Sequence, residues 1–207
     1  MAQKYILTGG PGVGKSTLIE EISKMNIYTL KEAASFIIEG ELARGGDCLP
    51  WIKRDEFQKR VLETQIQWEK EIPLEVAFSF QDRGIADGIA YYLLDGLAPP
   101  STLLEAARRS DYAGIFLLES LSTYQNTQIR REDQEQGQKL HEKINEVYKN
   151  LGYSIKRLPA APLEERLHAL FDRIYANKML LNAGLKGIFE HDAMKQPAKR
   201  DTRGGKR

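Results

Sequence analysis

The segment from Gly9 to Thr17, which reads GGPGVGKST, constrains this chain more than any other part of it. It matches the pattern G-x-x-x-x-G-K-[ST], in which a curled glycine-rich backbone points its N–H groups at the phosphates of a nucleotide. We expect the lysine to reach the β- and γ-phosphates of ATP and the following serine to place its hydroxyl on Mg²⁺. The residues expected to bind the nucleotide are Gly9, Gly10, Pro11, Gly12, Val13, Gly14, Lys15, Ser16 and Thr17.

The residues on either side of this loop have the patterns that the loop requires. Gln3 to Leu7 reads as a short strand rich in β-branched and aromatic residues. The 16–25 segment carries apolar residues at helical spacing. The positive end of that helix would face the same anion. Strand, loop and helix therefore follow one another in the order of a phosphate-binding loop.

Composition favours one globular domain over residues 1–185. The chain has 207 residues, of which 42% are hydrophobic, and it has no apolar run long enough to cross a membrane. It begins without a charged-then-apolar leader, so we expect a cytoplasmic protein without membrane contact. Thirty basic and 29 acidic residues give a net charge near +1, which argues against nucleic acid as the main partner.

The C-terminal residues 186–207 form a basic tail in the sequence. The last part, 195–207, has six Lys or Arg residues and no large apolar residue, so we expect it to be disordered. A tail of this kind can make weak contact with RNA or an anionic surface, or it can simply aid solubility. We favour the second interpretation.

Short apolar runs alternate with helical patterns along the chain, which predicts a parallel sheet with helices on both faces. The fold class expected is a three-layer α/β/α sandwich around a five-stranded parallel sheet. Three amphipathic segments, 54–72, 134–151 and 162–176, have apolar stripes that we expect to pack against the sheet, so that their aromatic residues lie in the core. The predicted strands are 3–7, 27–30, 74–80, 113–118 and 153–158.

Ligands of such sheets bind at the carboxyl ends of the strands, and charged residues follow several of these ends. Asp82 and Arg83 come directly after an apolar run. Asp82 can hold Mg²⁺ through water or accept the proton of an attacking hydroxyl, and Arg83 can bind substrate or phosphoryl oxygens. The alternative is that Asp82 caps the following helix and pairs with its neighbour.

Glu32 follows the second predicted strand, and Glu119 follows the fourth. We expect Glu32 to face the acceptor and to orient a sugar or another hydroxyl compound. It can equally be an acidic residue in the first turn of a helix. The turn-rich stretch Gly45–Pro50 is expected to form part of an acceptor pocket or a mobile cover.

Arg130 and Arg131 lie in a polar segment after the fourth predicted strand, where a closing lid of about 120–135 would be placed. A lid arginine would stabilise the phosphoryl group during transfer and exclude water. Since Glu132 and Asp133 follow directly, the alternative is an ion-pair run on the surface.

The sequence lacks two signatures of other nucleotide-binding proteins. The one candidate for the guanine-reading N-K-x-D motif, Asn177–Leu180, has no Asp. The apolar runs also do not end in the paired acidic residues expected of a motor ATPase, since Asp82 is followed by Arg83 and Glu119 is alone. The pattern therefore favours kinases of small molecules.

Over about residues 3–176 the chain resembles the AAA-labelled P-loop domain shared by predicted bacterial ATPases and nicotinamide-riboside-kinase-like proteins, within the nucleoside and nucleotide kinase group. The resemblance implies a kinase-type strand order, ATP with Mg²⁺, and phosphotransfer or hydrolysis. Members often have an Asp and a Gly before the lid arginine, whereas this chain has NTQI at 126–129. The segments that carry the resemblance are 9–17, KEAA at 31–34, DRG at 82–84 with AYYL at 90–93, Arg130 with Arg131, and VYKNLGY at 147–153.

The sequence therefore predicts a magnesium-dependent, ATP-binding phosphotransferase. Its acceptor would be a small nucleoside-like or other hydroxyl compound lying between Glu32, Asp82 and the predicted 85–95 helix. The alternatives are an ATPase and a nucleotide-gated binding module without kinase activity.

Overall fold

The computed structural model describes residues 2–120 and 128–175 of the chain, and it describes side chains in these ranges except at 128–134. The strands are β1 (Gln3–Thr8), β2 (Tyr28–Leu30), β3 (Phe78–Asp82), β4 (Gly114–Leu118) and β5 (Ile155–Leu158). The helices are α1 (Lys15–Lys24), α2 (Ala33–Arg44), α3 (Arg54–Lys70), α4 (Asp87–Leu94), α5 (Ser101–Arg109), α6 (Gln128–Asn150) and α7 (Leu163–Tyr175).

All five strands are parallel, and their order in the sheet is β2-β3-β1-β4-β5. The central strand β1 pairs with β3 on one side and with β4 on the other, so that Leu7 lies opposite both Asp82 and Phe116. Because the strands are parallel, the loop after β1 and the residues that end β3 meet at the same edge of the sheet. This architecture confirms the predicted five-stranded sheet of the kinase type.

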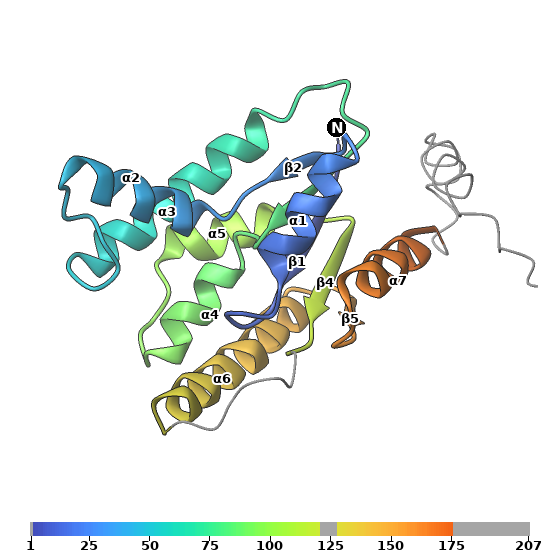
Figure 1. The fold of residues 1–207 in the computed structure, drawn as a ribbon. Coiled ribbons are helices and arrows are strands. Elements are labelled where there is room, and N and C mark those ends of the chain that lie inside the picture. Colours follow the sequence, from blue (N-terminus) through green and yellow to red (C-terminus); the bar gives the residue numbers. More distant parts are fainter. Residues whose placement is uncertain (1, 121–127, 176–207) are drawn as a thin grey trace, which may run out of the picture.

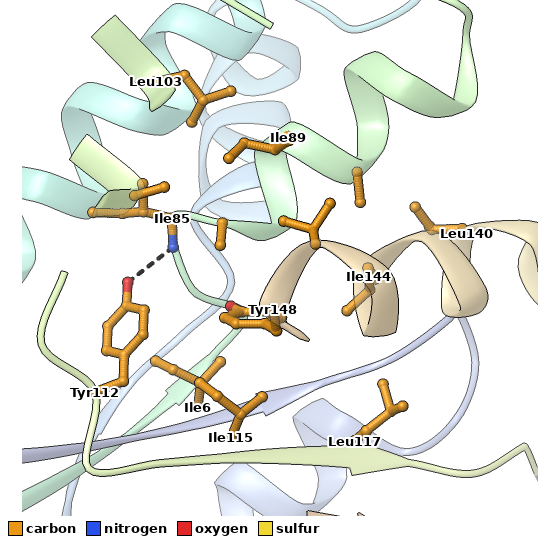
Figure 2. Packing of buried hydrophobic residues seen from close by; sticks show 14 of the residues in the cluster. Ile6, Ile85, Ile89, Leu103, Tyr112, Ile115, Leu117, Leu140, Ile144 and Tyr148 are labelled. Atoms are coloured by element: carbon orange, nitrogen blue, oxygen red, sulfur yellow. Dashed lines mark hydrogen bonds between the residues drawn. The ribbon is translucent and has the colours of Figure 1, made fainter. Parts of the chain in front are cut away.

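Two hydrophobic cores cover the two faces of the sheet and make the fold a three-layer sandwich (Figure 1). Neighbouring residues of β1 point to opposite faces, so Leu7 packs under α1 and α7 while Ile6 packs under α4, α5 and α6. Figure 2 shows the second core, where the Tyr112 hydroxyl accepts a hydrogen bond from the Ile85 amide at 3.0 Å.

The third strand begins later than the predicted 74–80 run. Leu74 is 89% exposed, and the Val76 amide closes a turn on the Pro73 carbonyl at 3.1 Å. The strand instead continues through Gln81 and Asp82, which pair with β1. The apolar run gave the wrong bounds for this strand because its buried C-terminal end consists of two polar residues, Gln81 and Asp82.

Helices α2 and α3 lie at one end of the molecule, and α7 lies at the other (Figure 1). Of the apolar stripe predicted on the 54–72 segment, only Phe57 is fully buried, in a small core with Ile37 and Cys48. The ring of Trp68 contacts Phe36, which is 58% exposed, at 5.1 Å between centroids. The expectation that these aromatic residues all lie in the core was therefore wrong for Trp68, because α3 covers the sheet only in part.

Helix α6 begins at Gln128, six residues before the predicted start at 134, and it includes the positions of Arg130 and Arg131. Helix α5 was not predicted as a separate element. Residues 121–127 of the predicted lid and the whole basic tail, 186–207, fall outside the described residues. Across the described ranges, no helix has the length and apolar character needed to cross a bilayer.

Candidate nucleotide and acceptor site

The loop between β1 and α1 has the backbone conformation of a phosphate cradle. Gly9, Gly12 and Gly14 have φ values of 139°, 69° and 88°, which side chains disfavour. The first backbone hydrogen bond of α1 is donated by the Leu18 amide to the Gly14 carbonyl at 3.2 Å, so the amides of residues 15–17 at the start of this helix have no intrahelical acceptor. Free N–H groups at the start of a helix form an anion site.

Lys15 lies over this loop with its side chain buried. Its Nζ donates hydrogen bonds to the carbonyls of Gly10 at 2.8 Å and Gly9 at 3.4 Å. Burial, with a further contribution from the positive charge of Arg83, lowers the pKa of Lys15 from its ordinary 10.5 to about 8. The lysine is therefore a poorly solvated cation without an anionic hydrogen-bond partner among the described residues, which suits it to binding a phosphate.

Ser16 and Asp82 form a direct pair beside the loop. The Ser16 hydroxyl donates to Asp82 Oδ2 at 2.7 Å, whereas Asp82 Oδ1 is buried with no hydrogen-bond partner among the described residues. Burial raises the pKa of Asp82, although the charge of Lys15 and the Ser16 hydrogen bond oppose this effect. A hydroxyl and a carboxylate with one unused oxygen are ligands that Mg²⁺ accepts, so these two residues fit the ion that the fold implies.

No group of three or more His, Cys, Asp or Glu side chains within the described residues gathers into a metal site. Magnesium bound by Ser16 and Asp82 would therefore take its other ligands from water and phosphate oxygens, as it commonly does in phosphoryl-transfer proteins. The alternative that Asp82 caps the next helix does not hold, because α4 begins after Ala86 and has no side-chain cap.

Arg83 links the phosphate loop to the start of α2. It has a φ of 70°, which is unusual for a residue other than glycine, and its amide still donates to the Leu7 carbonyl at 3.0 Å. Its Nε donates to Glu32 Oε1 at 2.5 Å, and its Nη1 donates to the Gly9 carbonyl at 3.1 Å. The guanidinium also pairs with Asp87 at 3.2 Å, rather than with its neighbour Asp82.

Sequence reasoning missed Asp87, which connects several elements below this arginine. Its Oδ1 accepts hydrogen bonds from the Thr8 hydroxyl at 2.5 Å and from Arg83, and its Oδ2 accepts from the Tyr148 hydroxyl at 2.7 Å and the Gly84 amide at 3.1 Å. With four donors, Asp87 holds β1, the turn after β3 and α6 in one arrangement. The only signal in the sequence is its place four residues after Arg83.

Glu32 occupies the N-cap position of α2, but its side chain does not cap the helix. Besides accepting from Arg83, it accepts a hydrogen bond from the Ser35 hydroxyl at 2.6 Å. Burial works against its ionisation, yet the charge of Arg83 and the Ser35 hydrogen bond outweigh burial and lower the pKa of Glu32. Glu32 is therefore the N-cap residue of α2 and not an acidic residue of its first turn, which contains none, and its predicted role toward an acceptor stays a prediction.

A cavity of about 820 Å³ opens between the phosphate loop and helices α2, α3 and α4. Asp82 does not line this cavity itself, but it accepts a hydrogen bond from Ser16, which does. Pro50, at the end of the 45–50 turn, lines the cavity, and the role of this turn toward an acceptor stays a prediction. The lining residues are Pro11, Gly12, Gly14, Lys15, Ser16, Thr17, Glu32, Ala33, Ala34, Ser35, Ile38, Pro50, Arg54, Phe57, Gln58, Val61, Gln65, Arg83, Asp87, Gly88, Tyr91 and Asp95.

Two further elements hold the phosphate loop from its other side. Arg166 of α7, another residue that sequence reasoning missed, donates from Nη1 to the Val13 carbonyl and from Nη2 to the Glu119 carbonyl at 2.9 Å. A Cβ built on Gly10 would lie 2.9 Å from the Gly137 carbonyl oxygen of α6. The loop is therefore packed tightly between α6 and α7.

Arg130 and Arg131 lie near the start of α6, but their side chains are outside the described residues. Their predicted contact with the phosphoryl group stays a prediction. Glu119, the other charged residue at a strand end, pairs with Arg157 at 2.5 Å and lies 3.5 Å from His141, and it does not line this cavity.

A five-stranded parallel sheet with this loop, and with a carboxylate beside the loop serine, defines a P-loop nucleotide-binding protein of the kinase type. The model of the AAA domain family matches residues 4–166, which is most of the chain. The chain therefore belongs to that family. A comparison with curated proteins finds no match.

Solved structures with the same fold include two thymidylate kinases. The enzyme from Ehrlichia chaffeensis is 14% identical, with a TM-score of 0.55 over 84% of this chain and 98% of that one. The enzyme from Candida albicans is 18% identical, with a TM-score of 0.59 over 86% of this chain and 92% of that one.

NadR protein in complex with NAD and AMP-PNP also shares the fold. It is 17% identical, with a TM-score of 0.60 over 81% of this chain. The match spans 47% of the NadR chain, so this protein corresponds to about half of NadR. At these identities the likeness shows the fold alone.

Proposed function

We propose that this protein is an ATP-dependent phosphotransferase that uses magnesium and acts on a small hydroxyl-bearing acceptor of nucleoside-like size. One observation carries this proposal. The phosphate loop opens directly into a cavity whose wall contains Glu32 and Arg83 bonded to each other at 2.5 Å. A site for ATP alone would not need the part of this cavity that extends beyond the phosphate loop between α2, α3 and α4, with its own carboxylate and guanidinium.

Lys15, Ser16 and Asp82 act on the nucleotide side in this proposal. Lys15 would leave the carbonyls of its own loop and bind the β- and γ-phosphates. Ser16 and Asp82 would hold magnesium, whose charge offsets that of the triphosphate when it is bound. The hydrogen bond of Asp82 to Ser16, the other proposed ligand of the ion, and the unused Oδ1 of Asp82 favour the metal role over the alternative role of accepting a proton.

Glu32 and Arg83 act on the acceptor side. Glu32 would accept a hydrogen bond from the acceptor hydroxyl and so orient its oxygen toward the γ-phosphorus. As the new O–P bond forms, the bond to the β–γ bridging oxygen breaks, ADP leaves with the electron pair, and the hydroxyl proton passes to Glu32 and then to water. The low pKa of Glu32 makes it a weak base. A weak base is sufficient for this proton transfer, because a loose phosphoryl-transfer transition state needs little help from a base.

Arg83 has one end of its guanidinium available for this reaction. Its Nε and Nη1 are occupied, whereas its Nη2 has no hydrogen-bond partner among the described residues. We propose that Nη2 binds the transferring phosphoryl group, with Arg130 or Arg131 adding charge from the start of α6.

The decisive experiment is to incubate the purified protein with Mg·ATP and a panel of nucleosides, nucleotides and cofactor precursors, and to measure ADP and phosphorylated product together. Acceptor-dependent ADP with a matching product supports the phosphotransferase. ADP release that no acceptor changes would overturn it and favour the alternative of an ATPase or a nucleotide-gated module.

Replacing Asp82 with Asn tests the proposed metal role. Turnover should fall about 100-fold or more, because the amide lacks the charge that holds the ion. ATP affinity should change little, since the loop and Lys15 are intact. The matched control is Asp172→Asn on the exposed face of α7, which should keep its rate. A D82N variant that turns over like the control would contradict the assignment.

A further inference from the structure

The charges that line the acceptor cavity restrict the kind of molecule that can enter it. Apart from Lys15 of the phosphate loop, the described lining has two guanidinium groups and three carboxylates, which leaves one negative charge in excess. These residues are Arg54, Arg83, Glu32, Asp87 and Asp95.

Both arginines already have anionic partners. Arg54 forms an ion pair with Asp95 and donates to the Tyr91 carbonyl at 3.3 Å, and Arg83 pairs with Glu32 and Asp87 as described above. Among the described lining residues outside the phosphate loop, both cations are therefore neutralised by carboxylates. Arg83 Nη2 keeps a free N–H donor, but it is assigned above to the transferring phosphoryl group and not to a phosphate of the acceptor. A phosphate group that leaves water needs charged donors, and a doubly charged phosphate would instead meet an excess of carboxylates here.

The wall formed by α3 is uncharged along the middle of the cavity. Gln58, Val61 and Gln65 are three and four residues apart and therefore lie on one face of the helix, next to Phe57. Both glutamines are half-buried, and neither amide has a hydrogen-bond partner among the described residues. Two free amides between apolar side chains suit the edge of a planar heterocycle, which has both donors and acceptors but no full negative charge.

We propose, on the basis of the phosphotransferase function above, that the acceptor carries no phosphate when it binds. The protein would phosphorylate a neutral or positively charged nucleoside-like compound in preference to a nucleoside monophosphate. The fold does not distinguish these two classes, and the pairing of Arg54 and Arg83 with carboxylates is what favours the first.

The test compares matched pairs, in which each nucleoside is set against its own 5′-monophosphate with Mg·ATP, and nicotinamide riboside represents the cationic class. We expect at least one nucleoside to give phosphorylated product with a kcat/KM about 100-fold above that of its monophosphate. A monophosphate that is used as well as its nucleoside, or better, would overturn this inference and leave the phosphotransferase proposal intact. A lack of acceptor-dependent product in both classes would overturn the proposed function itself.

A charge variant tests the cause of the preference. Asp95→Asn releases Arg54 from its ion pair, so the preference for the nucleoside over its monophosphate should shrink about tenfold through a lower KM for the monophosphate. Glu105→Gln is the matched control, because it removes one carboxylate from an exposed pair with Arg109 on α5, outside the cavity. If the preference in D95N equals that in the control, the charges of the cavity do not set it.

Discussion

Two residues of the phosphate site, Lys15 and Asp82, have polar atoms whose hydrogen bonding would change when a nucleotide binds. Lys15 is buried against the carbonyls of its own loop, and Asp82 keeps one buried oxygen without a partner among the described residues. Both groups have pKa values displaced against their charged forms, mainly by burial. Polar groups of this kind are costly in the free protein, and a bound triphosphate with its magnesium would satisfy both of them.

The pKa of Lys15 predicts that nucleotide binding takes up protons under mildly alkaline conditions. Its value of about 8 lies below the ordinary 10.5, so the free protein loses this proton as the pH rises through about 8. A bound triphosphate favours the charged lysine, and affinity should therefore fall as the pH rises above that value. Calorimetry of Mg·ATP binding, in two buffers with different ionisation enthalpies, should show proton uptake at about pH 8.5 and less at about pH 7.5. Equal heats in the two buffers at the higher pH would exclude this coupling.

At the scale of elements, the phosphate loop depends on its packing against α6 as much as on its own glycines. The Gly10 backbone lies against the Gly137 carbonyl, and a Cβ on Gly137 would lie 3.4 Å from the Pro11 ring. On the same helix, Tyr148 donates to Asp87, which bonds Arg83. Helix α6 therefore contacts both sides of the site, and a change in its position would affect the nucleotide and acceptor groups together.

The substitution Gly10→Ala, which adds one methyl group to the loop, should test how closely the loop packs against α6. In Gly10→Ala the new Cβ would lie 2.9 Å from a backbone oxygen of α6, so the loop or the helix must shift. We expect a loss of about 1–3 kcal/mol in the free energy of unfolding, together with weaker ATP binding. Urea unfolding and calorimetry would measure the two effects.

The control for this variant is Gly40→Ala in the middle of α2, where an added Cβ has no atom within 4 Å. It should raise the free energy of unfolding by about 0.5–1 kcal/mol, because alanine favours a helix over glycine. Equal stability of the Gly10 variant and the unmodified protein would show that the contact with α6 is not tight.

At the scale of the whole molecule, the described residues divide into the sheet with its two large cores and the α2–α3 end with a small one. Helix α3 has 17 residues and buries one of them fully, and the core that joins it to α2 consists of three buried residues. The cavity proposed for the acceptor is lined by residues of this end and of the phosphate loop. A part with few buried contacts opens at low free energy and can adapt to a ligand.

Hydrogen exchange should reveal this difference. Amides of β1 should exchange only through global unfolding, whereas amides of α2 should exchange through smaller openings. Addition of an acceptor that is turned over should slow exchange in α2 and α3 more than in β4. If α2 is protected as strongly as β1 in the free protein, the two parts form one cooperative unit.

Local patterns determined the phosphate loop, its strand and helix, the parallel sheet and the presence of charged residues at the strand ends, because each depends on spacing within a short segment. The tertiary structure alone decided how those charges pair. Arg83 pairs with Glu32, 51 residues away, and Asp87 joins it through contacts with β1 and α6. The cavity and its paired arginines likewise arise from α2, α3 and α4, whose positions depend on crossovers and packing between distant segments. No pattern within a single segment encodes such long-range contacts.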